Sequence, residues 1–146
     1  MKLEDHELAS VEAHCLEYES ELWGIYRHIA EEAFPERNRE QHKEIFLHFL
    51  RHALENKLFL LKEDPDFVRH LNSVAPPHRQ YRLPEPGTPA EFEAFFRLFW
   101  PEPENPEYDM EILVVLEAGG RIWWMQDGEP TEWFLGYPGN RRKPAR

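Results

Sequence analysis

The segment 120–134 constrains the fold of this chain more than any other stretch. It places three tryptophans and a phenylalanine around the dipeptide Asp127-Gly128, which is typical of the two-residue turn of a β-hairpin. The apolar run 110–116 lies just upstream, across a pair of glycines. Together these segments predict a three-stranded antiparallel meander.

Both faces of this meander would be apolar, because side chains alternate between the two faces of a strand. One face would carry Met110, Ile112, Val114, Leu116, Trp123, Met125 and Phe134, and the other Leu113, Val115, Ile122, Trp124, Trp133 and Leu135. An antiparallel sheet in a small domain usually leaves one face to water. Each face must therefore be covered, either by helices of the chain or by a partner.

The charge balance limits the classes of partner. The chain has 146 residues, with 28 acidic against 17 basic side chains and a net charge of -11. A surface this acidic is unsuited to neutralising phosphates, so neither nucleic acid nor an anionic membrane is an expected partner. A basic protein is the partner that this charge favours.

Cysteine usage and the first residues favour the cytoplasm. Cys15 is the only cysteine, which excludes an internal disulfide and a Cys-rich zinc site. It lies on an apolar helical stripe, so we expect it to pack in the core rather than to act as a nucleophile. The first residues are acidic and lack the apolar core of a signal peptide. We therefore expect a cytoplasmic protein.

Apolar spacing predicts about three helices. Residues 8–29 follow steps of three and four, with a bend near Ser20. A second helix is expected over 37–57. The third, over 89–100, begins with Thr88 as N-cap, a proline at the first helical position and a glutamate placed for a capping box.

Two segments are expected to be irregular. Residues 63–87 contain five prolines, which predicts a loop with at most a short helical turn at 67–71. The basic tail 138–146 is expected to be flexible. Residues 58–61 fit either a short buried strand or a helix end. The sequence thus predicts a single α+β domain over 1–146, in which about three helices pack on a C-terminal antiparallel sheet of three to four strands.

One pattern in this order of elements is specific. Ile-Trp-x-x-x-Asp-Gly-x-x-x-x-Trp, at 122–133, follows a helix that begins at Thr88-Pro89-Ala90-Glu91 and ends at Phe99-Trp100-Pro101. In this respect the chain resembles, over residues 22–134, the bacterial family catalogued as domain of unknown function 596, whose members are small cytosolic α+β proteins. Residues 68–86 depart from that pattern. The resemblance implies no catalytic residues, and the family is similar in size and acidity to the immunity proteins that protect bacteria from toxins.

Four-residue steps bring Glu44, His48 and His52 to one face of the second helix, where two imidazoles and a carboxylate can meet a metal ion. The other interpretation is a solvated face on which the histidines pair with Glu44 and Glu55. No matching ligand group is evident elsewhere in the sequence. We therefore expect neither a metal nor another cofactor.

A cluster of carboxylates separates the third helix from the meander. It comprises Glu102, Glu104, Glu107, Asp109 and Glu111, interleaved with prolines. One interpretation is a solvated acidic linker. The other is a docking segment, because an extended acidic stretch beside an aromatic sheet suits a basic protein partner.

The expected partner-binding residues are Trp124, Trp133, Glu104, Glu107, Asp109 and Glu111. On the second sheet face, Trp124 and Trp133 would act as aromatic anchors rimmed by these carboxylates. Under the other interpretation the N-terminal helix covers that face and both tryptophans belong to the core.

No nucleotide-binding loop or nucleophile motif is present. We therefore expect a non-enzymatic binding protein that neutralises or regulates a basic partner, as an immunity protein does for a bacterial toxin. One alternative is a homo-oligomeric structural protein, such as a homodimer that buries Trp124 and Trp133 against its own copy. Another is a metal-dependent enzyme that uses the helical face bearing His48. A winged-helix interpretation fails, because Arg97 is the one basic residue of its recognition helix.

Overall fold

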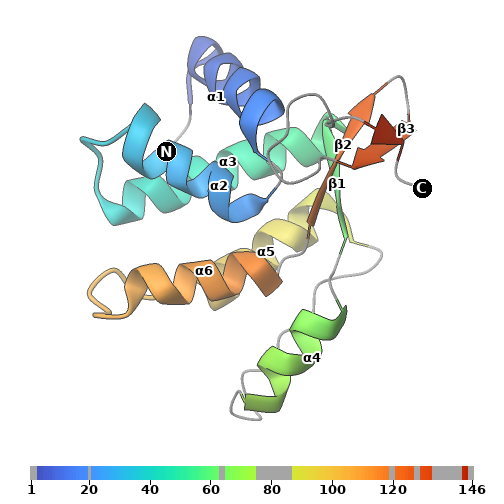
Figure 1. The fold of residues 1–146 in the computed structure, drawn as a ribbon. Coiled ribbons are helices and arrows are strands. Elements are labelled where there is room, and N and C mark those ends of the chain that lie inside the picture. Colours follow the sequence, from blue (N-terminus) through green and yellow to red (C-terminus); the bar gives the residue numbers. More distant parts are fainter. Residues whose placement is uncertain are drawn as a thin grey trace.

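The computed structural model describes residues 3–19, 21–62, 65–74, 87–118, 121–126, 129–132 and 143–144. Its helices are α1 (Asp5–Tyr18), α2 (Leu22–Arg27), the π-helix η1 (His28–Ala33), α3 (Arg39–Glu55), α4 (Pro65–Val74), α5 (Pro89–Phe99) and α6 (Tyr108–Ala118). Its strands are β1 (Phe59–Lys62), β2 (Arg121–Gln126), β3 (Glu129–Glu132) and β4 (Lys143–Pro144). Figure 1 shows α1, α3 and α6 one below another, with the small sheet at one side. Within the described segments, no helix has the length and apolar character needed to cross a membrane.

Helix α3 lies at the centre of the fold, and the predicted helix over 37–57 is confirmed. Its start is set by Asn38, whose side chain accepts from the Gln41 amide while the Gln41 side chain accepts from the Asn38 amide. Its buried apolar residues are Ile45, Phe46, Leu47, Phe49, Leu50 and Ala53, none more than 1% exposed. This set covers more than one stripe, because α3 packs against α2, η1, α5 and β1.

The end of α3 turns the chain into the sheet. Lys57 adopts a left-handed backbone conformation, with a φ of 55°. The Leu58 amide then donates to the Ala53 carbonyl at 2.9 Å and the Lys57 amide to the Leu54 carbonyl at 3.2 Å, which is the paired bonding of a Schellman motif. Of the two structures that residues 58–61 allowed, the strand is the one that forms.

The N-terminal helical stretch is divided, as its pattern predicted. Helix α1 ends at Tyr18, Glu19 is extended, and α2 begins at Leu22. Helix α2 runs directly into η1, where the Phe34 amide donates to the Ile29 carbonyl, five residues back. The chain leaves the helix at Phe34, because a residue before proline disfavours the helical region.

The predicted start of the third helix is also confirmed. Thr88 accepts from the Glu91 amide at 3.2 Å, and the Glu91 side chain accepts from the Thr88 amide at 2.9 Å. Helix α5 then buries Phe95 and Phe96 and stops at Trp100, before Pro101.

The strands of the predicted hairpin are confirmed, but the third strand beside them comes from elsewhere. Strands β2 and β3 pair antiparallel, with Gln126 opposite Glu129. On the other side of β2 lies β1, with Phe59 opposite Trp124. The strand order is β1-β2-β3-β4. The neighbour of β2 is therefore the segment after α3, not the run 110–116.

The run 110–116 is a helix, so the predicted meander is wrong. It lies in α6, whose buried side chains are Tyr108, Ile112, Val115 and Leu116, at helical spacing. Its apolar part, 112–116, fits a buried helix as well as a strand, and here packing against α2 and α5 favours the helix. The prediction of about three helices on a C-terminal sheet of three to four strands is therefore also wrong. The described residues are mostly helical, and the sheet is a minor part of them.

The proline-rich segment 63–87 contains a helix longer than the single turn that its sequence predicted. Proline is tolerated in the first turn of a helix, and Pro65 opens α4. Val68 and Leu71 are buried, and α4 contacts α6. Residues 75–86 lie outside the described part. Of the tail 138–146, Lys143–Pro144 pair with β3, and the remaining tail residues also lie outside the described part.

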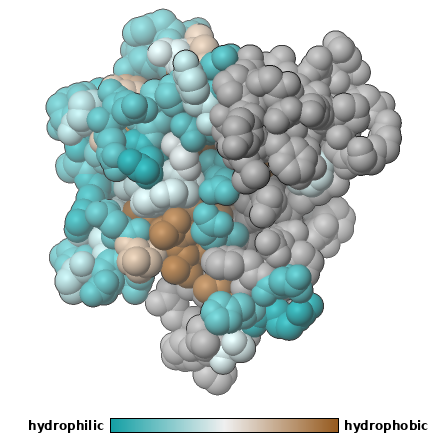
Figure 2. All heavy atoms as spheres, in the orientation of Figure 1, coloured by the Kyte–Doolittle hydropathy of each residue, from teal (hydrophilic) through white to brown (hydrophobic). Residues whose placement is uncertain are grey.

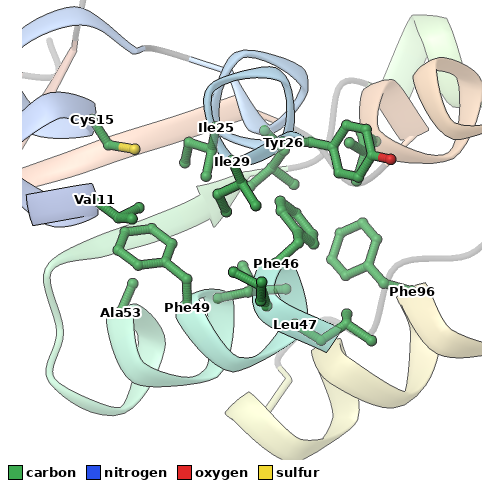
Figure 3. Close-up of a cluster of buried hydrophobic side chains, with 14 of the residues drawn as sticks. Val11, Cys15, Ile25, Tyr26, Ile29, Phe46, Leu47, Phe49, Ala53 and Phe96 are labelled. Atoms are coloured by element: carbon green, nitrogen blue, oxygen red, sulfur yellow. The ribbon is translucent and has the colours of Figure 1, made fainter. Parts of the chain in front are cut away.

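Side chains from α1, α2, η1, α3 and α5 meet in one core (Figure 3). Cys15 is fully buried there, which confirms its predicted place. Burial raises the pKa of the Cys15 thiol far above its usual value, and the nearby Glu19 carboxylate raises it further. The thiol therefore stays protonated and acts as a small apolar group.

Trp124 ties the sheet to the helices. Its side chain is 1% exposed and stands edge-on to Phe59, with ring centroids 5.1 Å apart. Its Nε1 donates to the Glu19 carbonyl at 2.9 Å, just after α1 ends. The prediction that Trp124 is an exposed partner anchor is wrong, because the end of α1 meets this side of the sheet. The core interpretation holds for this residue.

Replacing Trp124 by alanine should therefore destabilise the fold. We expect Trp124→Ala to lower the free energy of unfolding by about 3–5 kcal/mol, because it empties a packed site and removes the bond to Glu19. Leu60→Ala, on the neighbouring strand and 40% exposed, is the matched control and should change it far less. Urea denaturation of both variants measures the difference. Equal losses would contradict the role of Trp124 as the tie between sheet and helices.

Candidate binding surface

The chain between α5 and α6, together with the first two residues of α6, forms an ordered acidic segment that we call the acidic loop, defined here as residues 101–109. Trp100, just before it, donates from Nε1 to the hydroxyl of Tyr108 at 2.9 Å. Arg39 stacks its guanidinium over the Tyr108 ring, 4.4 Å from the centroid, and donates to the Pro103 carbonyl at 2.6 Å. The loop is thus held at both ends and near its middle.

Asn105 orders the second half of the loop. Its side-chain oxygen accepts from the Glu107 amide at 2.8 Å, and its carbonyl accepts from the Tyr108 amide at 3.0 Å. Its amide nitrogen Nδ2 donates to Glu111 at 3.1 Å. These bonds start α6, and the acidic residues of the first turn, Asp109 and Glu111, suit the positive end of the helix dipole.

The carboxylates of the acidic loop project into solvent. Glu102, Glu104, Glu107 and Asp109 are exposed, and none forms an ion pair within the described part of the chain. Glu111 is half-buried and bonded to Asn105. No arginine or lysine of the described segments thus forms an ion pair with these four carboxylates, and the Arg39 guanidinium, which lies against Tyr108 and Pro103, offsets their charge only at longer range.

Carboxylates on the face formed by α3 and α5 have a different environment. Arg97 binds Glu44 at 2.7 Å and Glu93 at 3.0 Å, and Arg51 binds Glu93 at 2.8 Å and Glu55 at 2.9 Å. The Arg97 hydrogen bond holds the pKa of Glu44 below its usual range. Within the described segments the carboxylates are thus unevenly paired, with ion pairs on this face and none on the acidic loop.

An apolar face of α6 adjoins the acidic loop. Met110, Leu113 and Val114 lie at helical spacing, with Met110 58% exposed and the other two half-buried. Figure 2 shows hydrophobic side chains gathered over α6, with hydrophilic residues at the loop end of the helix. We call these three residues the α6 apolar face.

A cavity of about 300 Å³ opens beside Asp109, between the acidic loop and the N-terminal helices. It is lined by Trp23, Tyr26, Ala30, Glu31, Arg39, His42 and Asp109. A second hollow of about 560 Å³, next to it, shares Arg39 and His42 and reaches Pro103. His42 donates from Nε2 to the Phe34 carbonyl at 2.7 Å, which fixes its ring in the wall.

The tyrosines beside this cavity are not suited to acid–base chemistry near neutral pH. Burial raises the pKa of Tyr26 far above its usual value, and the interaction with Tyr108 adds to this rise. Burial likewise raises the pKa of Tyr108. Both hydroxyls therefore stay protonated and serve as hydrogen-bonding groups.

The predicted partner-binding residues do not form one cluster. Glu104, Glu107 and Asp109 are exposed together, Glu111 is partly withdrawn, and Trp124 is buried at the sheet. Trp133 lies outside the described residues. Sequence reasoning missed Met110 as a surface residue, because a strand period placed it on a covered face. The packing of α6, rather than a sequence pattern, places Met110 at the surface.

The face with Glu44, His48 and His52 does not assemble a metal site. Glu44 binds Arg97, His48 accepts from the Leu3 amide at 3.0 Å, and His52 faces Glu12 at 3.4 Å. Each candidate ligand is thus held by a different partner. The predicted pairing of these histidines with Glu44 and Glu55 is not seen either, because Arg97 and Arg51 take those carboxylates.

No protein-family model, no curated protein and no solved structure matches this chain. The resemblance to domain of unknown function 596 therefore stays a prediction, and function has to be argued from the chain's own residues.

The ion pairs on the face formed by α3 and α5 predict that the stability of the fold depends on pH. Because the folded-state pKa of Glu44 lies below its unfolded value, the stabilisation by Arg97 is present above the ordinary glutamate pKa of about 4.3 and is lost as pH falls through the folded-state pKa. We expect Arg97→Gln to cost at most about 1 kcal/mol at neutral pH, since the pair is partly exposed, and less in acid. Urea denaturation at neutral pH and at a pH below the folded-state pKa of Glu44 measures this cost.

Arg69→Gln, which removes the exposed pair with Asp66, is the control and should have almost no effect on the free energy of unfolding at either pH. A cost of Arg97→Gln that grew in acid would contradict the assignment.

Proposed function

We propose that this chain is a non-enzymatic binding protein of the cytoplasm that neutralises or regulates a basic protein partner, as an immunity protein neutralises a bacterial toxin. The observation that carries this proposal is the presence of an ordered acidic loop, whose exposed carboxylates form no ion pair within the described segments, beside the exposed α6 apolar face. An apolar anchor beside unpaired charge is a common composition of protein interfaces.

Electrostatics support a basic partner. Four exposed carboxylates of one loop, in a chain of net charge -11, produce a local negative field that speeds encounter with a cationic surface. A basic toxin active site covered by these carboxylates would be blocked stoichiometrically, without any reaction.

Order in the loop supports tight binding. Arg39, Trp100 and Tyr108 already hold its backbone, so little conformational entropy remains to be lost when a partner docks. The α6 apolar face supplies the contact area that the sequence had assigned to Trp124.

The cavity beside Asp109 supports the same class of partner. Two carboxylates, Glu31 and Asp109, and two aromatic rings, Trp23 and Tyr26, line it together with Arg39 and His42. A lysine or arginine side chain of a partner would gain from the carboxylates and the ring faces, against the repulsion of the Arg39 guanidinium, which is itself engaged by the Tyr108 ring and the Pro103 carbonyl. Glu31 is also bound by Arg27, so Asp109 is the carboxylate that a partner would use first.

The two alternatives have less support. A dimer that buries Trp124 against its own copy needs that side chain at the surface, and it is 1% exposed. A metal-dependent enzyme on the face bearing His48 needs three ligands that converge, and these are held apart.

Neutralising the acidic loop should weaken partner binding. The partner to test is a basic protein encoded beside the gene for this chain, co-expressed with it to form a 1:1 complex that dissociates at high salt. We expect the triple variant Glu104→Gln, Glu107→Gln, Asp109→Asn to bind at least about tenfold more weakly at low salt, mainly through slower association. Surface plasmon resonance at two salt concentrations measures both rates.

A second triple variant controls for net charge. Asp5→Asn, Glu21→Gln and Glu36→Gln remove the same charge from exposed positions outside the loop. This control should bind almost as the wild type does. Equal weakening of both triple variants would show that overall charge, not the loop, drives binding, and the absence of a complex with the basic neighbour would contradict the proposal.

The α6 apolar face gives a separate prediction. Met110→Ser should weaken the same complex by roughly 1–2 kcal/mol while changing the free energy of unfolding by less than about 0.5 kcal/mol, because the side chain is exposed in the free protein. Leu98→Ser on α5 is the matched control, since Leu98 is 77% exposed and equally apolar. Binding by calorimetry and stability by urea denaturation distinguish the two effects. If Leu98→Ser weakened binding and Met110→Ser did not, the interface would have to be moved to α5.

A further inference from the structure

Two histidines and two carboxylates meet where α1 faces η1. His14 lies on α1, Glu19 follows its last residue, and His28 and Glu32 lie on η1. His14 Nε2 is 3.1 Å from Glu19 and 3.8 Å from Glu32, while His28 Nδ1 is 2.8 Å from Glu32. The imidazole rings are stacked, with centroids 3.6 Å apart and planes 7° from parallel.

The backbone brings these groups together by two local features. Helix η1 is a π-helix, a rare form that is frequent at functional sites, and its wider turn still leaves His28 and Glu32 on one face. Gly24 lies under the Glu19 carboxylate, and a Cβ at this position would overlap it. The absence of a side chain at Gly24 therefore lets Glu19 turn toward His14.

The cluster is partly buried and open on one side. Exposed side-chain fractions are 11% for His28, 20% for Glu19, 24% for His14 and 62% for Glu32. An ion can therefore reach the cluster from the side of Glu32.

We propose that His14, His28, Glu19 and Glu32 form a binding site for one divalent transition-metal ion, of which Zn²⁺ is the reference case. Imidazole nitrogens and carboxylate oxygens are the donors that Zn²⁺ accepts beside thiolates. One ligand atom from each of His14, His28 and Glu32 lies within 4.8 Å of the others. Tetrahedral bonds of about 2.0–2.1 Å place ligand atoms about 3.3 Å apart, so these three side chains must move closer together, and Glu19, which contacts His14, must move with them.

The stacked rings define what changes on binding. An imidazole binds a metal in its own plane, and an ion in the plane of one ring lies outside the plane of a parallel neighbour. One of the two rings must therefore turn about its terminal torsion, which is a soft rotation for histidine. The hydrogen bonds of the two imidazoles to Glu19 and Glu32 are replaced by bonds to the metal, and the ion takes the place of any proton shared between the rings and the carboxylates.

The ordinary alternative is a set of partly buried hydrogen-bonded pairs with no ligand. The metal site and the hydrogen-bonded pairs use the same residues, so the affinity for Zn²⁺ and the coordination geometry of the bound ion distinguish them. The proposal is independent of the partner-binding function, because it concerns the isolated chain and a face that does not include the acidic loop.

The test is calorimetric titration of the full chain, freed of metal by chelation, with ZnCl₂. We expect one equivalent to bind with micromolar or tighter affinity, and Co²⁺ in its place to give the visible absorption of a tetrahedral or five-coordinate site. His14→Ala and His28→Ala should each weaken Zn²⁺ at least about tenfold, since even outer-shell changes at zinc sites cost 10–100-fold. Binding should also raise the melting temperature of the wild type by mass action.

A chain with eight histidines needs a matched control for surface binding. His52→Ala serves, because His52 is similarly exposed, at 28%, and also faces a glutamate. It should leave the first equivalent of Zn²⁺ unchanged. Gly24→Ala is a second probe that keeps all four ligands and displaces only Glu19, so it should weaken Zn²⁺ several-fold in a folded protein. Zn²⁺ affinity that is the same in His14→Ala, His28→Ala and wild type, with circular dichroism confirming the fold, would overturn the proposal.

Discussion

The burial of α3 on several sides is the constraint on which the rest of the structure depends. Six of its apolar side chains are at most 1% exposed, and they contact helices before and after it as well as the first strand. Burial on this scale is the main favourable term in folding, and it leaves little freedom in how α2, η1 and α5 can pack. The acidic loop and the histidine cluster lie outside this core, where its neighbours meet.

Two buried aromatic side chains link these outer groups to the core, each through a polar atom. Trp124 donates to the Glu19 carbonyl, and Glu19 in turn contacts His14 in the proposed metal site. Trp100 donates to the Tyr108 hydroxyl, and Tyr108 receives the Arg39 guanidinium that holds the acidic loop. A buried indole N–H needs an acceptor, and here each acceptor lies at the edge of a candidate site. Packing and site geometry are therefore coupled at both places.

Local signals in the sequence were sufficient to predict an element when the interaction that determines its structure is itself local. The capping residue Thr88, the apolar spacing in 37–57 and the antiparallel pairing of the strands before and after Asp127-Gly128 were predicted from the sequence and are present in the structure. The candidate site was predicted only in part. Carboxylates of the acidic loop were identified from composition, whereas Trp124 was placed on an exposed face, because nothing in the sequence indicates that α1 ends against the sheet.

By itself the sequence determined the charge of the chain, the starts of α3 and α5, the hairpin and the inert Cys15, because these follow from composition or from contacts within a few residues. Only the tertiary structure decided that 110–116 is helical, since its apolar part, 112–116, has no period of its own and its conformation depends on the elements that pack against it. Tertiary structure also decided that β1 pairs with β2 and that His14 meets His28, because contacts between distant segments depend on packing that no local pattern encodes.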